Sequence, residues 1–139
     1  MTNWASIVGN VGTNQYANRI EALKRKNLDT APIEECVEKT IQSLNKGNGR
    51  SFVIFGEPQS GKTEMMIALN ARLLDEGTNI IINLLTDSLD LLGQSLDRFR
   101  GSGLSPSPKQ FSELPTDPAD LTGKKWVIFA RKMHVILKI

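Results

Sequence analysis

One glycine-rich segment near the middle of the chain constrains its fold more than any other feature. Residues 56–63 read Gly-Glu-Pro-Gln-Ser-Gly-Lys-Thr and fit the pattern G-x-x-x-x-G-K-[ST]. A short run of strand-forming residues, 51–55, precedes this segment, and a run rich in helix formers, 64–74, follows it. Strand, glycine loop and helix in this order are the context in which the pattern forms a phosphate-binding P-loop.

Each residue type in the loop has a physical reason to be there. Gly56 and Gly61 permit backbone angles and a close approach that a side chain would block. N–H groups of the loop and the positive end of the following helix then converge on phosphate oxygens. We expect Lys62 to reach the β- and γ-phosphates of ATP and the Thr63 hydroxyl to ligate Mg²⁺. The predicted nucleotide-binding residues are Gly56, Glu57, Pro58, Gln59, Ser60, Gly61, Lys62, Thr63 and Glu64.

Composition sets outer limits on the function. The chain has 139 residues, of which 40% are hydrophobic and 23% charged, as in ordinary globular proteins. A net charge of +2 is too small to indicate nucleic-acid binding by bulk electrostatics. The single cysteine, Cys36, excludes an intramolecular disulfide and is expected to pack in the interior. With no apolar run of membrane-spanning length and no signal pattern, we expect a cytoplasmic protein.

Hydrophobic periodicity predicts an alternation of helices and strands along the chain. The expected elements are helices over 14–27, 31–44, 64–74 and 89–99 and strands over 51–55, 79–85 and 126–130. The strands over 79–85 and 126–130 are nearly unbroken apolar runs, which predicts that both faces of each are covered. Residues 102–122 are rich in Ser, Pro and Asp and indicate a long surface loop with at most a short helix. Residues 131–139 resemble the start of another helix.

This order of elements predicts an α/β fold with a parallel sheet. We expect an N-terminal helical segment over residues 1–49, followed over residues 50–139 by part of a P-loop NTPase domain of the RecA-like, three-layer type. Ligands in such sheets bind at the carboxyl ends of the strands, where the P-loop lies. The apolar residues 135–139 have no predicted partner, so we expect the chain to be the first part of a longer, incomplete domain.

From about residue 52 to residue 99 the sequence resembles the ATP-binding module of superfamily-two helicase-like proteins. The specific likeness is to the branch found in restriction and phage-defence systems, including the Z-one domain. Three pieces match in order: the Gln-Ser-Gly-Lys-Thr loop at 59–63, the strand at 80–85 with Thr-Asp-Ser after it, and Leu-x-x-Gln-x-x-x-Arg-Phe ending at Phe99. The resemblance implies an ATP hydrolase that acts on DNA.

In such proteins the segment after the second strand lies along the nucleic-acid backbone. The resemblance therefore makes Thr86, Ser88 and Gln94 candidates for nucleic-acid contact. A serine that caps a helix beside polar helix residues needs no ligand, so a structural role for Ser88 stays open.

The chain departs from this family in its acidic residues. The family has an Asp-Glu pair at the end of a strand that holds Mg²⁺ and orients water, and residues 100–139 contain no such pair. Asp87 follows a strand and is the one candidate for a catalytic acid, although that strand carries the substrate-contact segment in the family. We therefore expect a truncated product of a longer ATPase that hydrolyses ATP poorly alone.

Two other functions stay open at this point. In a small P-loop kinase acting on a metabolite, Asp87 would activate the acceptor hydroxyl and residues 102–122 would serve as a lid. Alternatively, the chain is a module that holds nucleotide without turning it over. Whichever applies, an open sheet edge and the apolar residues 135–139 lead us to expect self-association or a partner subunit.

Overall fold

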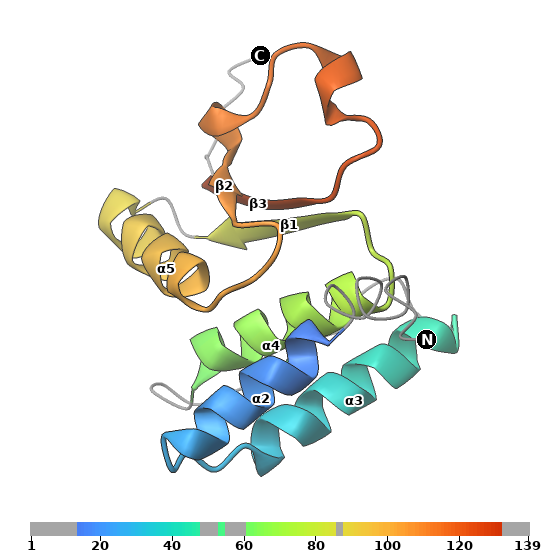
Figure 1. The fold of residues 1–139 in the computed structure, drawn as a ribbon, viewed down its shortest axis with the longest axis vertical. Helices are drawn as coiled ribbons and strands as arrows, with labels where there is room; N and C mark the ends of the chain where they lie inside the picture. The colour runs from blue at the N-terminus through green and yellow to red at the C-terminus, as the bar shows by residue number, and fades with distance from the viewer. Residues whose placement is uncertain (1–13, 48–52, 55–60, 86–87, 132–139) are drawn as a thin grey trace, which may run out of the picture. The chain divides into compact units, whose positions relative to one another are not determined.

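The computed structural model describes residues 14–47, 53–54, 61–85 and 88–131. The chain divides into two compact units between Gly77 and Thr78. The first unit contains helices, and the second contains a small parallel sheet with a helix against it (Figure 1). The architecture is therefore α/β, as predicted.

Three helices make up the described part of the first unit: α2 (Gln15–Arg25), α3 (Ala31–Asn45) and α4 (Lys62–Asp75). They lie side by side in Figure 1, with α4 in contact with both of the others. All three were predicted within a few residues of these bounds. Pro32 stands in the first turn of α3, where its missing N–H costs nothing. Gly77 follows α4 with φ +95°, a left-handed conformation that glycine adopts readily and that ends a helix.

The core of the helical unit comes from one apolar stripe on each helix. Ile20 of α2, Val37 and Ile41 of α3 and Ala68 of α4 form a cluster of buried residues. Tyr16, Ile33, Leu69 and Leu73 pack against this cluster. A buried polar side chain on these helices bonds to the backbone of its own helix: the Thr40 hydroxyl donates to the Cys36 carbonyl over 2.8 Å. The three helices are therefore held together mainly by apolar burial.

The second unit is built on a three-stranded parallel sheet. Its strands are β1 (Ile80–Leu85), β2 (Lys109–Gln110) and β3 (Trp126–Arg131), in the order β1-β3-β2. Ile82 pairs with Ile128, and Gln110 pairs with Phe129. The helix α5 (Leu89–Gly101) connects β1 to the segment that carries β2. Between β2 and β3 lie two short 3-10 helices, η1 (Phe111–Glu113) and η2 (Pro118–Leu121).

The two long strands differ in how they are covered. In β3, Trp126 to Phe129 are all buried, which confirms the prediction for that strand. Phe129 meets Phe99 of α5 edge-on, with ring centroids 4.7 Å apart.

In β1, by contrast, every second side chain is open to solvent: Ile80 is 57%, Ile82 59% and Leu84 70% exposed. The prediction that β1 is covered on both faces is therefore wrong. An apolar run signals burial, but it does not show whether one face of the strand or both faces are covered.

The segment predicted as a long surface loop is more ordered than its composition indicates. Arg100 of α5 donates through Nε to the Pro108 carbonyl at 3.2 Å and forms an ion pair with Glu113 at 3.0 Å. Leu104 and Pro108 are buried. The Trp126 indole N–H donates to the Leu121 carbonyl at 3.0 Å. These contacts tie both halves of the segment to the sheet unit.

Two predicted elements fall largely outside the described residues. Of the strand expected over 51–55, only Val53 and Ile54 are described, and neither belongs to a strand. Of the helix expected over 131–139, only Arg131 is described, and it is the last residue of β3. None of the helices in the described ranges is long and apolar enough to cross a lipid bilayer.

Candidate functional site

The candidate nucleotide site centres on the first turn of α4. Gly61 is the N-cap of this helix and has φ +79° and ψ 24°, a left-handed conformation that costs a residue with a side chain free energy. The Gly61 carbonyl accepts the first hydrogen bond of the helix from the Met65 N–H at 3.0 Å. The change from loop to helix therefore falls between the glycine and the lysine of the motif.

The structure describes four of the predicted nucleotide-binding residues: Gly61, Lys62, Thr63 and Glu64. The other five, residues 56–60, lie outside the described residues. Lys62 is exposed and Thr63 is half-buried in the first turn. The N–H groups of a first helical turn have no acceptor within the helix, and the helix dipole makes that end positive. Together with the lysine, this end of α4 fits an anionic phosphate group.

Glu64 is the one acidic residue in the first turn of α4. Arg19 of α2 donates to its carboxylate through Nη2 at 2.5 Å and through Nε at 3.2 Å. The two side chains are only 12% and 18% exposed, so solvent screens this pair less than one at the surface. The guanidinium therefore offsets the negative charge that Glu64 brings near the expected phosphate site. Nothing local in the sequence points to Arg19, because it lies in a different helix.

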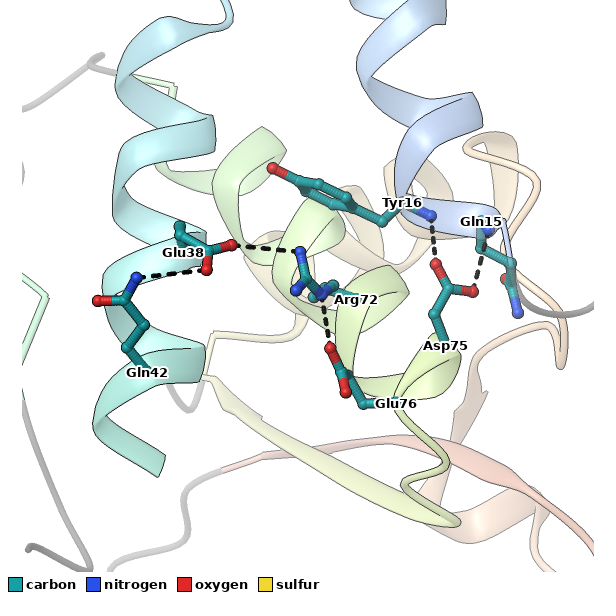
Figure 2. Close-up of polar contacts among 7 residues, drawn as sticks. All are labelled: Gln15, Tyr16, Glu38, Gln42, Arg72, Asp75 and Glu76. Atoms are coloured by element: carbon teal, nitrogen blue, oxygen red, sulfur yellow. Dashed lines mark hydrogen bonds and ion pairs between the residues drawn. The ribbon is translucent and has the colours of Figure 1, made fainter. Parts of the chain in front are cut away.

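At the other end of α4, a second carboxylate holds α2. The Asp75 side chain accepts hydrogen bonds from the backbone N–H groups of Gln15 at 3.0 Å and Tyr16 at 2.9 Å (Figure 2). Asn14, the N-cap residue of α2, makes no capping bond with its own side chain. The cap of α2 is therefore supplied by a different helix.

Arg72 joins the three described helices of this unit. It bonds to Glu76 at 2.9 Å and to Glu38 of α3 at 3.4 Å, and its guanidinium lies 5.5 Å from the Tyr16 ring centroid (Figure 2). The hydrogen bond to Glu76 is the main cause that raises the pKa of Arg72. Burial, and then the nearby Glu34 carboxylate, raise the pKa of Tyr16. The contacts of Arg72 with Glu76, Glu38 and Tyr16 hold the helices together, so we assign these side chains a structural role.

A cavity of about 420 Å³ lies beside α3. Cys36, Lys39 and Ser43 line it from the helix, and Val53 and Ile54 line it from the connection to the glycine loop. Cys36 is half-buried rather than packed in the interior, so the sequence-based expectation for this residue is wrong. The apolar stripe of α3 passes beside Cys36 and is completed by Val37 and Ile41.

The sheet unit has a separate pocket of about 300 Å³ at the carboxyl ends of β2 and β3. It is lined by residues of α5, β2, η1 and β3: Leu89, Leu92, Gln110, Phe111, Ser112, Phe129, Ala130 and Arg131. The carboxyl ends of parallel strands are where α/β proteins bind ligands. Sequence reasoning missed this pocket, since it treated residues 102–122 as a loop.

The candidates for nucleic-acid contact are only partly described. Thr86 and Asp87 lie outside the described residues. Ser88 caps α5, with its hydroxyl accepting from the Leu91 N–H at 3.4 Å. Gln94 is exposed on α5 and does not line the pocket of the sheet unit. Ser88 therefore has the structural role that stayed open in the sequence, that of a helix N-cap.

Comparison of this chain with protein-family models, with curated proteins and with solved structures found no match.

Proposed function

We propose that this chain binds a nucleoside triphosphate, ATP with Mg²⁺, through residues 56–64, and that it is the ATP-binding portion of a helicase-like ATPase acting on DNA. One observation carries the proposal. The motif G-x-x-x-x-G-K-[ST] ends where α4 begins, with a left-handed Gly61 directly before Lys62. This is the arrangement that directs helix N–H groups, a lysine and a hydroxyl towards one anion.

Each described residue has a defined task in this proposal. Lys62 neutralises charge on the β- and γ-phosphates, and the Thr63 hydroxyl joins the ligands of Mg²⁺. The metal, held by the triphosphate, offsets the negative charge of the phosphate oxygens. Glu64 does not face the nucleotide as an isolated charge, because Arg19 holds its carboxylate.

The DNA-acting part of the proposal rests on the sequence resemblance to superfamily-two helicase-like proteins of restriction and defence systems. Residues 100–139 contain no Asp-Glu pair at a strand end, and β3 ends in Ala-Arg. Phosphoryl transfer depends on several positioned groups acting together. We therefore expect binding of ATP without rapid turnover by this chain.

Calorimetry with Mg²⁺–ATP tests the binding step. Lys62→Ala removes a charge-assisted contact worth about 1.5–3 kcal/mol, so the dissociation constant should rise about ten- to hundredfold. Lys46→Ala is the matched control, because it removes the same charge from an exposed position in the same unit and should leave affinity unchanged. Equal dissociation constants for the wild type and Lys62→Ala would refute the proposal.

Turnover is measured separately, as phosphate release with and without single-stranded DNA. Release at about one per second or faster, which is ordinary for ATPases and kinases, would contradict the expectation of slow turnover. It would also direct attention to Asp87 as the acid that completes the site.

A further inference from the structure

We infer that the pocket at the carboxyl ends of β2 and β3 binds an unpaired nucleobase, stacked on Phe111, with its phosphate next to Arg131. The pocket lies wholly within the sheet unit and shares no residue with the proposed triphosphate site. The choice of a DNA strand as the source of the base rests on the proposed DNA-acting function. The pocket itself is a feature of the structure and does not depend on that proposal.

The size and lining of the pocket suit a base. Its volume of about 300 Å³ is at the lower end of the range of about 300–1,000 Å³ in which small ligands bind. Leu92 and Phe129 are buried side chains that form apolar wall. Gln110 and Ser112 are the uncharged polar residues of the lining, and the Gln110 side chain also accepts a hydrogen bond from the Glu113 N–H in the cap of η1. A mainly apolar cavity with a few polar groups is the usual construction of a ligand site.

Phe111 is the feature that points to a flat, aromatic ligand. Its side chain is 69% exposed, and Leu89 across the same pocket is 66% exposed. Isolated apolar residues at a surface are common, but these two belong to one concave site. An exposed ring is a surface on which any base can stack, because every base has a π-face.

The turn that carries Phe111 is held by a hydrogen bond within it and by the side chain of Arg100. Glu113 accepts a hydrogen bond from the Gln110 N–H at 2.6 Å and pairs with Arg100 at 3.0 Å. Arg100 also donates to the Pro108 carbonyl, one residue before β2. α5 and the sheet therefore fix the position of η1, which Phe111 begins. A backbone that is already fixed at Phe111 reduces the conformational entropy lost when a ligand binds.

Charge at this edge of the sheet favours an anionic ligand. Arg131 lines the pocket at the end of β3, and its guanidinium suits a phosphate. The acid nearest in sequence to the stacking residue, Glu113, is already paired with Arg100. A base with an attached phosphate satisfies both the apolar cavity and the cation.

The test is fluorescence anisotropy of the full chain with a labelled oligothymidylate of about ten nucleotides, a length within the range that single binding modules cover. Phe111→Ala should weaken binding about 5- to 150-fold, the effect of losing one stacked base, and Phe111→Trp should restore it. Leu84→Ala is the matched control, since Leu84 is 70% exposed in the same unit but lies outside the pocket; it should bind as the wild type does. Arg131→Ala should weaken binding and reduce the salt dependence by about one ion.

Two further ligands distinguish the possible sources of the base. An abasic strand of the same length should bind the wild type as weakly as oligothymidylate binds Phe111→Ala. Thymidine monophosphate that displaces the strand only at far higher concentration supports a strand as the ligand. Displacement at equal concentration would instead assign the pocket to a free nucleotide and overturn the choice of DNA.

The Lys62→Ala variant separates this inference from the proposed ATP site. If it binds oligothymidylate normally, the two sites are independent, whatever the outcome with ATP. Unchanged binding in Phe111→Ala, or no binding of either the strand or the nucleotide by the wild type, would overturn the inference.

Discussion

Replacing Asp75 tests how the helical unit is held together. In the wild type, its carboxylate caps α2 by accepting hydrogen bonds from the Gln15 and Tyr16 N–H groups at 3.0 and 2.9 Å. Asp75→Ala removes both acceptors and a negative charge from the positive end of α2. Loss of a cap costs about 0.5–2 kcal/mol, and hydrogen bonds to charged groups contribute about 1.5–3 kcal/mol.

The expected loss of unfolding free energy lies in the first of these two ranges, because water can replace part of the cap. Asp75 and the two hydrogen bonds are only partly buried, so water can reach the N–H groups of α2 that the substitution leaves without the carboxylate. We therefore expect the free energy of unfolding to fall by about 1–2 kcal/mol. With a urea slope of about 1–2 kcal/mol per molar, the unfolding midpoint should fall by about 1 M.

Urea unfolding followed by helical circular dichroism measures this midpoint. Hydrogen exchange adds a local measurement, since the amides of Gln15 and Tyr16 should lose protection in Asp75→Ala. Glu21→Gln is the control: Glu21 belongs to the same unit, and its ion pair with Arg25 is exposed, so its loss should cost well under about 1 kcal/mol. An unchanged midpoint together with unchanged exchange at both amides would refute the role of Asp75 as the cap.

Two further predictions concern stability. Phe99→Ala should lower the free energy of unfolding by about 3–5 kcal/mol, because Phe99 is fully buried against Phe129; equal urea midpoints for Phe99→Ala and the exposed Phe111→Ala would contradict this packing. Burial raises the pKa of Tyr16 above its ordinary value of 10.0, so the folded state keeps its proton at a pH where the unfolded state has lost it. The free energy of unfolding should therefore fall as the pH rises through 10 towards the folded pKa, and urea midpoints measured across this range should fall less in Tyr16→Phe.

Much of the fold follows from local patterns. The apolar stripes that predict α2, α3 and α5 need only the spacing of residues such as Leu92, Leu96 and Phe99. The burial of β3 was predicted from another local pattern, its nearly unbroken apolar run. Where prediction from the sequence failed, the cause was long-range. β1 looks like a strand covered on both faces because Ile80, Ile82 and Leu84 are apolar, yet these side chains are exposed.

The candidate sites divide in the same way. The helix after the motif was predictable because the motif specifies consecutive residues that lead into a helix, and α4 begins at Lys62, two residues before the expected start. The pocket of the sheet unit was not predictable, because it gathers Leu89, Phe111 and Arg131 from elements far apart in sequence. β2, which helps to align them, is only two residues long and lies in a segment whose prolines and serines indicate a loop.

The two carboxylates that join α4 to α2 have a mechanical consequence. Glu64 and Asp75 lie about three helical turns apart, near opposite ends of α4 and on nearly the same side of it. Arg19 holds the first, and the start of α2 holds the second. With two attachment points along one line, α4 cannot rotate about its own axis without breaking at least one of them. The direction in which Lys62 and Thr63 project is therefore set by α2, which fixes the rotation of α4 through contacts near both of its ends.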